Sequence, residues 1–243
     1  MTIDKRVEDE KKIFKYQSFR WGPCVAKFKI DEDFRQRLLV EAEKSHADHT
    51  HKLAGILTKQ ISFRNPDLFF KDFDYYFEVW NYSLAQWNGE LVKYENGKKI
   101  IQKETPDKYL MEALWCNWQG PGDFNPPHDH GGDLTWVIYL KIPEELDEEN
   151  KRYKGRSAGP GGITFVYGEN ADRKCITHHS VYPEQGDMIM FPAWLKHWVY
   201  PFKSDCTRIS VSGNASTTIK LHKIKPIADK MKESNAMFKK NEK

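Results

Sequence analysis

The stretch that decides the fold of this 243-residue chain covers residues 125–140 and reads NPPHDHGGDLTWVIYL. Its two prolines favour an extended backbone ahead of His128 and His130. Side chains at positions i and i+2 of extended backbone point to the same side, so the two imidazoles converge. Two glycines then permit a sharp turn into an apolar run typical of a buried strand. Such a pair of imidazoles is a common beginning of a metal site, although two surface histidines in a polar loop fit this stretch equally well.

Other short runs of strand-like residues surround this stretch. Glycines, prolines and acidic clusters separate them, which predicts a sandwich, a barrel or a jelly roll. Helical patterns precede the strands, so we expect an α+β protein, mainly β, with helices packed on one face of a sheet. The runs cover residues 110–118, 134–141, 162–167, 187–192, 196–201 and 207–213.

The first part of the chain predicts the supporting helices. Short β-like runs occur within residues 14–30, and a helix follows Asp31. A second helix is expected over residues 66–88, where Asn65 is the candidate N-cap and Pro66 the first helical residue. Its aromatic residues recur at steps of three and four, which indicates a wide apolar face lying on a sheet.

These patterns predict one domain over residues 14–219. Helical support covers about 31–88 and a β-rich core about 110–215. Residues 1–13 are charged and expected to be flexible, and residues 220–243 form a basic tail. Residues 144–162 are interpreted as a connection or a substrate lid.

A second histidine lies in an apolar setting at residues 186–201, GDMIMFPAWLKHWVYP. His197 stands between Trp194 and Trp198, and a neutral imidazole buried there needs a polar partner. A metal ion or a backbone group could supply that partner.

A third motif, RISVSGN at residues 208–214, carries a cation. In a strand, Arg208 and Ser210 share one face, and an inward-facing arginine in an apolar strand must be paired. Its guanidinium grips a carboxylate with two hydrogen bonds. The carboxylate could belong to a ligand or to an internal Asp or Glu. Together, the three motifs place candidate metal ligands at one end of a pocket and a carboxylate clamp at the other, as a keto acid chelated to iron requires.

With these motifs the chain resembles the iron(II)- and 2-oxoglutarate-dependent oxygenases, and among them the bacterial and phage 2OG-Fe(II) oxygenases related to prolyl hydroxylases. The resemblance is strongest over residues 117–214. It implies a double-stranded β-helix, which is a cupin-like jelly roll, with N-terminal supporting helices. It also implies Fe(II) as cofactor and 2-oxoglutarate as cosubstrate. In this interpretation Arg208, Ser210, Tyr139 and Asn117 bind the cosubstrate.

The chain departs from the usual pattern of this superfamily at one ligand. Most members combine His-x-Asp with a distant His, whereas residue 130 is His here. We therefore predict His128, His130 and His197 as metal ligands and catalytic residues. Asp133, beyond the two glycines, is the alternative carboxylate ligand.

The resemblance predicts a dioxygenase that hydroxylates a small molecule or a protein side chain while 2-oxoglutarate and O2 become succinate and CO2. Two alternatives stay open at this point. One is a cupin-type metalloenzyme with three histidines and no 2-oxoglutarate, and the other is a jelly-roll binding module without catalysis. Arg208 has no evident role in either alternative.

The amino-acid composition of the chain excludes several other classes of protein. Aromatic residues make up 14% of the chain, enough to build a core although 30% of the residues are charged, so global disorder is not expected. No stretch approaches the roughly 18 apolar residues of a membrane-spanning helix, and the charged first residues do not resemble a signal peptide. Four widely spaced cysteines favour a cytoplasmic protein with reduced thiols. The net charge is +3, but residues 220–243 contribute +5, so the weakly acidic body argues against nucleic acid as a partner.

Overall fold

The computed structural model describes residues 22–44, 55–87, 106, 108–168 and 177–218 with their side chains. It also describes the backbone of residues 3–9, 12–20, 47–48, 92–95 and 98–101. The basic tail, residues 220–243, lies outside the described residues, as does Cys175. Within the described part, no helix is both long and apolar enough to cross a membrane.

Eight strands near the middle and end of the chain form two facing antiparallel sheets. In the larger sheet, here called the major sheet, the order β13-β10-β15-β8 lies at the centre. The smaller or minor sheet has the order β12-β11-β14-β9. Apart from β11 and β12, which are neighbours in the minor sheet, successive strands alternate between the two sheets. This is the topology of a double-stranded β-helix, or jelly roll, and it confirms the predicted fold class. The strands are β8 (Lys108–Gln119), β9 (Asn125–His128), β10 (Leu134–Lys141), β11 (Ile163–Val166), β12 (His178–Val181), β13 (Asp187–Pro192), β14 (His197–Val199) and β15 (Arg208–Thr218).

Further strands extend the major sheet on both sides, so that its full described order is β1-β2-β3-β13-β10-β15-β8-β5-β4. A separate hairpin is formed by β6 and β7. The bounds are β1 (Ile3–Asp9), β2 (Lys12–Arg20), β3 (Cys24–Lys29), β4 (Ala47–Asp48), β5 (Lys59–Ser62), β6 (Val92–Glu95) and β7 (Lys98–Ile101).

The N-terminus differs from the expectation of a flexible segment over residues 1–13. Ile3–Asp9 forms β1 and pairs antiparallel with β2 along its whole length. A strand pairs through its backbone groups, so the charged sequence does not prevent this pairing.

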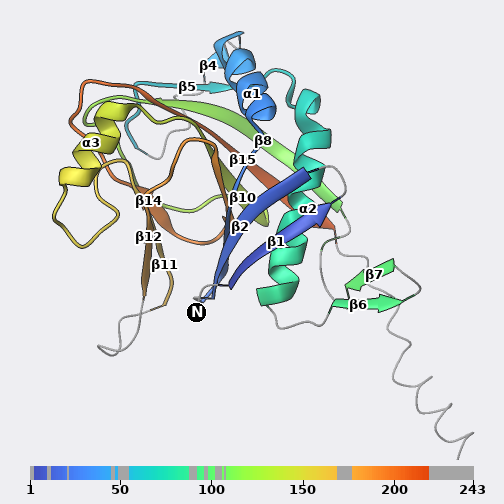
Figure 1. Ribbon diagram of the computed structural model, residues 1–243. Helices are drawn as coiled ribbons and strands as arrows, with labels where there is room; N and C mark the ends of the chain where they lie inside the picture. The colour runs from blue at the N-terminus through green and yellow to red at the C-terminus, as the bar shows by residue number, and fades with distance from the viewer. Residues whose placement is uncertain are drawn as a thin grey trace, which may run out of the picture.

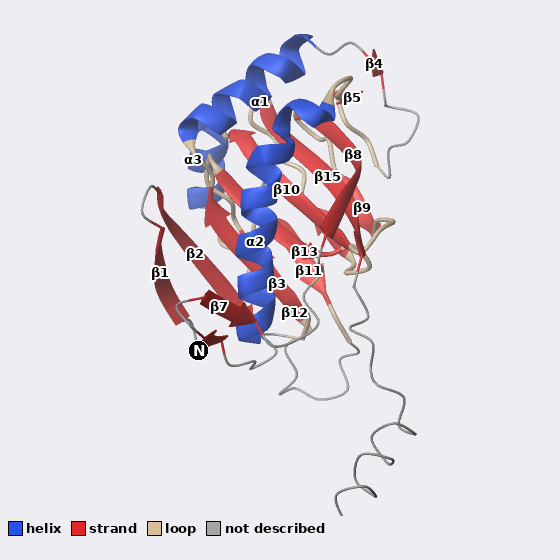
Figure 2. Ribbon diagram, turned by 90° about the vertical axis from the view of Figure 1, so that its right-hand side faces the viewer, coloured by secondary structure: helices blue, strands red, loops and turns tan. Residues whose placement is uncertain are grey.

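Both expected helices are present, and they cover the outer face of the major sheet. Figure 1 shows α1 (Glu32–Lys44) and α2 (Phe70–Trp87) on one side of this sheet and β11, β12 and β14 on the other. Figure 2 shows α2 lying across the strands of the major sheet. The helix predicted over 66–88 begins with the 3₁₀ turn η2 (Pro66–Phe69), and Asn65 makes no side-chain capping bond. Asn65 thus occupies the predicted N-cap position, where its backbone carbonyl accepts from the Leu68 N–H but its side chain caps no N–H group.

A third helix, α3 (Glu144–Arg152), occupies part of the stretch interpreted as a connection or lid. Acidic residues lie in its first turn and Lys151 and Arg152 in its last, which suits the helix dipole. Leu146 is its buried residue, so the helix lacks the apolar stripe that would have predicted it.

Two apolar cores separate the layers. One lies between the helices and the outward face of the major sheet and includes Phe73, Phe77 and Trp136. The other lies between the two sheets and includes Phe165 and Phe191. The second core fills only part of the space between the sheets, and the remainder is the cavity described next.

Candidate metal and cosubstrate site

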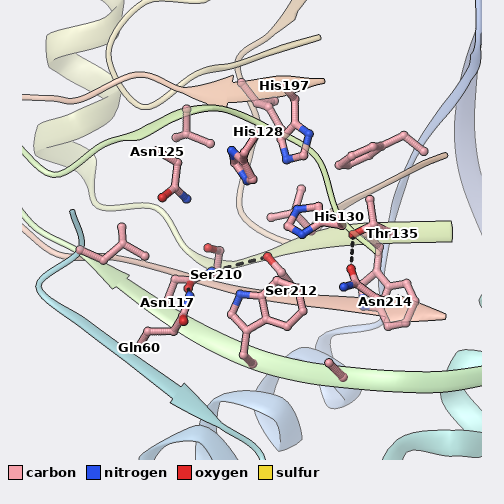
Figure 3. A pocket seen from close by; sticks show the side chains of 18 of the residues that line it. Gln60, Asn117, Asn125, His128, His130, Thr135, His197, Ser210, Ser212 and Asn214 are labelled. Carbon is pink, nitrogen blue, oxygen red and sulfur yellow. Dashed lines mark hydrogen bonds between the residues drawn. The ribbon is translucent and has the colours of Figure 1, made fainter. Parts of the chain in front are cut away.

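Three histidines meet between the sheets. One ligand nitrogen from each of His128, His130 and His197 lies within 4.8 Å of the other two. His128 ends β9 and pairs in register with His197, which begins β14. His130 lies in the turn that leads to β10, where its backbone N–H donates to the Ala193 carbonyl at 2.9 Å. Figure 3 shows the three rings turned toward one another.

Backbone carbonyls fix the orientation of two of these rings. His128 Nδ1 lies 2.7 Å from the Pro126 carbonyl oxygen, and His197 Nδ1 lies 2.9 Å from that of Leu195. A carbonyl oxygen can only accept, so Nδ1 carries the proton in both rings and Nε2 keeps its lone pair. This is the arrangement by which proteins hold imidazole ligands of metals.

The protonation of the three rings also suits metal binding. Burial lowers the pKa of His128, and it lowers that of His197 well below the usual range. Burial first, and then the neighbouring His128, lower the pKa of His130 to about 4. All three imidazoles are therefore neutral at pH 7, which is the state that binds a metal ion.

A buried cation lies at the other end of the same cavity. Arg208 is 4% exposed, and its Nη1 donates to the Gly161 carbonyl at 2.6 Å. Its Nε is buried without a hydrogen-bond partner among the described residues, which also offer it no ion pair with a carboxylate. The sequence allowed an internal Asp or Glu as the partner of Arg208. Among the described residues, no Asp or Glu pairs with it. Burial lowers the pKa of Arg208, as expected for a cation that still lacks a counter-charge.

Tyr139 faces this guanidinium. The Arg208 Cζ lies 5.2 Å from the centre of the Tyr139 ring. The Tyr139 hydroxyl is buried without a partner in the described structure, and burial raises its pKa to about 12. A neutral O–H donor and a guanidinium N–H without a partner therefore belong to residues of the same cavity, and a carboxylate that reached both would satisfy them.

The histidines and the arginine line one cavity of about 350 Å³. This volume is near the lower end of the range for small-molecule sites. The seven residues predicted to bind metal or cosubstrate all line it, and these are Asn117, His128, His130, Tyr139, His197, Arg208 and Ser210. That they bind iron and 2-oxoglutarate stays a prediction, which the proposal below takes up.

Asp133, the alternative ligand, does not line the cavity. Its carboxylate accepts from the backbone N–H of Thr217 at 2.7 Å and from the Thr217 hydroxyl at 2.8 Å. The carboxylate therefore fixes the turn to β15. Trp194 is also outside the cavity and is 54% exposed.

Sequence reasoning missed part of the cavity wall. Gln60, Thr135 and Asn214 line the cavity, and Gln60 comes from β5, far from the histidine motifs. Thr135 and Asn214 follow the two-residue alternation of Tyr139 and Arg208, so strand periodicity could have identified them. No local signal identifies Gln60, because the pairing of β5 with β8 brings it to the site.

Part of the chain matches a known protein family. Residues 113–214 match the family model described as "Putative 2OG-Fe(II) oxygenase". No curated protein matches the sequence.

Among solved structures, a viral collagen prolyl hydroxylase from Paramecium bursaria Chlorella virus-1, solved as its 2-oxoglutarate complex, is similar at 18% identity. The match covers 80% of this chain and 96% of the viral one, with a TM-score of 0.49. A prolyl-4-hydroxylase from Pseudomonas putida is similar at 13% identity over 85% of this chain and 93% of that one, with a TM-score of 0.45.

Proposed function

We propose that the protein is an Fe(II)- and 2-oxoglutarate-dependent dioxygenase that hydroxylates its substrate. The observation that carries the proposal is the buried guanidinium of Arg208, which has no carboxylate partner in the described structure and shares a cavity with three neutral histidines. An arginine buried without a counter-charge is costly unless a ligand supplies one. Neither a three-histidine metalloenzyme without 2-oxoglutarate nor a binding module requires this residue.

The residues present fit both groups. His128, His130 and His197 would hold the iron through nitrogen donors, which suit Fe(II). Arg208 and the Tyr139 hydroxyl would hold the distal carboxylate of 2-oxoglutarate, with Ser210 beside them on the same face. When bound, the iron and 2-oxoglutarate supply the oxidising power for hydroxylation, with O2 consumed and succinate and CO2 released.

The protein itself orients the metal ligands and excludes water from the cavity. Pro126 and Leu195 carbonyls hold two imidazoles in the orientation that directs Nε2 inward. Apolar side chains of Val137, Ile163 and Phe191 line the cavity and keep water from the charged end. We propose a small molecule or a protein side chain as substrate.

An anaerobic titration tests the proposal. Protein loaded with Fe(II) is expected to develop a visible charge-transfer band when 2-oxoglutarate is added. Arg208→Met is expected to keep the iron but weaken 2-oxoglutarate binding by at least about a hundredfold, because a charged bidentate pair in a buried site is lost. Arg208→Lys, which keeps the charge but loses the fork, should lie between these two proteins.

Other outcomes would point to the alternatives. Iron binding without any band would favour the metalloenzyme that does not use 2-oxoglutarate. A protein that binds neither Fe(II) nor Co(II) would be a binding module.

A further inference from the structure

The wall opposite the histidines is built from uncharged polar side chains. On the inner face of the major sheet, Ser210 lies beside Asn117, which lies beside Gln60. The next positions along β15 on this face are Ser212 and Asn214, and Thr135 pairs with Asn214. Figure 3 shows this amide wall, defined as Gln60, Asn117, Thr135, Ser212 and Asn214, across the cavity from His128 and His197.

Hydrogen bonds fix which way these groups point. Gln60 Nε2 donates to Asn117 Oδ1 at 2.7 Å, and Asn117 Nδ2 donates to Ser212 Oγ at 3.5 Å. The Thr135 hydroxyl shares its one hydrogen between the Gly213 carbonyl oxygen at 2.9 Å and Asn214 Oδ1 at 2.8 Å, with the Asn214 NH2 group as a donor.

An acceptor completes the cavity. The side-chain oxygen of Asn125, on β9, is buried without a partner in the described structure. The cavity thus offers amide donors on the wall and an amide acceptor on β9.

No described protein side chain that lines the cavity offers a free charge to an ionic substrate. Among the described lining residues, only Arg208 and Asp129 carry full charges. Asp129 is paired with Lys196 at 2.9 Å, and the proposed function assigns Arg208 to the cosubstrate. A charged substrate buried here would lack a protein counter-charge, which is costly.

An aromatic face completes the site. The half-buried Trp115 lies in the cavity wall, with its ring centre 5.6 Å from that of His130. An indole supplies flat apolar contact area, while hydroxyl groups both donate and accept hydrogen bonds. A polyhydroxylated ring matches this combination, and the small volume admits one ring beside the cosubstrate.

We propose that the substrate is an uncharged, polyhydroxylated ring compound, such as a neutral monosaccharide or a cyclitol, that binds against the amide wall and Trp115, which lies beside Ser212 on the same face of the major sheet. This inference rests on the proposed function, because it assumes that 2-oxoglutarate occupies Arg208.

Saturation-transfer NMR on the full chain, loaded with Zn(II) in place of iron and with 2-oxoglutarate, tests the inference. The probes are neutral monosaccharides and cyclitols. Each monosaccharide is compared with the corresponding uronate, which is negative, and the corresponding amino sugar, which is positive. At least one neutral compound is expected to bind about tenfold more tightly than its charged counterparts, because they would bury an unpaired charge. The inference would be overturned if no neutral compound bound. It would also be overturned if uronates, attracted by the charge of the metal, bound more tightly than the neutral compounds.

Two variants of the amide wall are tested, so that the result does not depend on the folding of a single variant. Asn214→Asp and Asn117→Asp each keep the acceptor oxygen bound by Thr135 or Gln60 and replace an NH2 group by a negative oxygen. Each should shift preference toward the amino sugar, whereas Gln36→Glu, which adds the same charge on α1 outside the cavity, should not. If 2-oxoglutarate fails to bind the wild-type protein loaded with Zn(II), the proposed function fails. If 2-oxoglutarate binds and the variants leave the preference unchanged, only the substrate inference fails.

Discussion

His130 determines the charge of the proposed metal site. Iron sites of this class commonly combine two histidines with one carboxylate. Here the third donor is an imidazole, and the alternative carboxylate considered from the sequence, Asp133, accepts two hydrogen bonds from Thr217 instead. Three neutral donors leave the metal one positive charge richer than the usual set. Asp133 and His130 are close in the sequence but make different contacts, so a single substitution at each position can separate their roles.

Substitution of these two residues should therefore have different effects. Asp133→Asn weakens the bonds to Thr217 and is expected to lower the free energy of unfolding by about 1 kcal/mol, since the site is exposed. It should leave Co(II) affinity unchanged. His130→Ala is expected to weaken Co(II) binding at least about tenfold through the loss of one of three donors. Calorimetric titration with Co(II) and urea unfolding measure the two effects, and a large loss of affinity in Asp133→Asn would make the carboxylate the ligand.

The depressed pKa of His130 predicts how the stability of the metal-free protein depends on pH. In the unfolded chain this imidazole takes a proton near its ordinary pKa of about 6.5, whereas in the folded protein it does so only near about 4. The unfolded state binds more protons between these values, so stability is full above pH 6.5 and falls as the pH drops toward 4. Urea unfolding of metal-free protein at several pH values should show this fall. His130→Asn should make it shallower, and an unchanged slope in that variant would contradict the assignment.

At the scale of elements, one glycine lets the helices dock on the major sheet. Gly213 lies on the outward face of β15, directly opposite Trp136 on β10. Without a side chain at Gly213, the Trp136 indole lies over β15 and contacts α2, with its ring centre 5.0 Å from Phe73 and 5.5 Å from Phe77. A flat aromatic ring over a strand glycine is a known way to stabilise such a position.

A methyl group at this glycine should be destabilising. In Gly213→Ala the new Cβ would overlap the Trp136 indole and lie 2.8 Å from the Ala113 carbonyl oxygen. We expect a loss of about 1–3 kcal/mol in the free energy of unfolding, as for other overpacked cores. Gly131→Ala is the matched control, because its Cβ would meet nothing within 4 Å. Equal midpoints of urea unfolding for the two variants would show that the ring moves aside freely.

Elements with a clear periodicity could be predicted from the sequence, and those made by distant pairing could not. The strands from β8 to β15 that carry apolar alternation, and the aromatic stripe of α2, are present where expected. The helix α3 was missed because Leu146 is its only buried residue. The same distinction holds within the site. His128, His197 and Arg208 stand in strands whose alternation predicts their direction, whereas Gln60 reaches the cavity only because β5 pairs with β8.

At the scale of the whole molecule, the two sheets divide the proposed ligands between them. His128 and His197 belong to the minor sheet, His130 lies in the turn that joins the sheets, and Arg208 belongs to the major sheet. A cosubstrate that binds the metal with one end and Arg208 with the other would join the sheets. Its binding should therefore stabilise the jelly roll as a unit, since it requires both walls of the cavity in place.

Thermal unfolding under anaerobic conditions can separate the two contributions. Each ligand at a hundredfold excess over its Kd adds about 2.7 kcal/mol, which for a domain of this size raises Tm by roughly 5–10 °C. We expect one step with Co(II) and a second when 2-oxoglutarate is added. Arg208→Met should keep the first step and lose the second, because only the major-sheet contact is removed. His197→Ala should lose both, since 2-oxoglutarate needs the metal as its other anchor. A second step that persists in Arg208→Met would mean that the cosubstrate does not reach the major sheet, and the proposed bridge between the sheets would then be wrong.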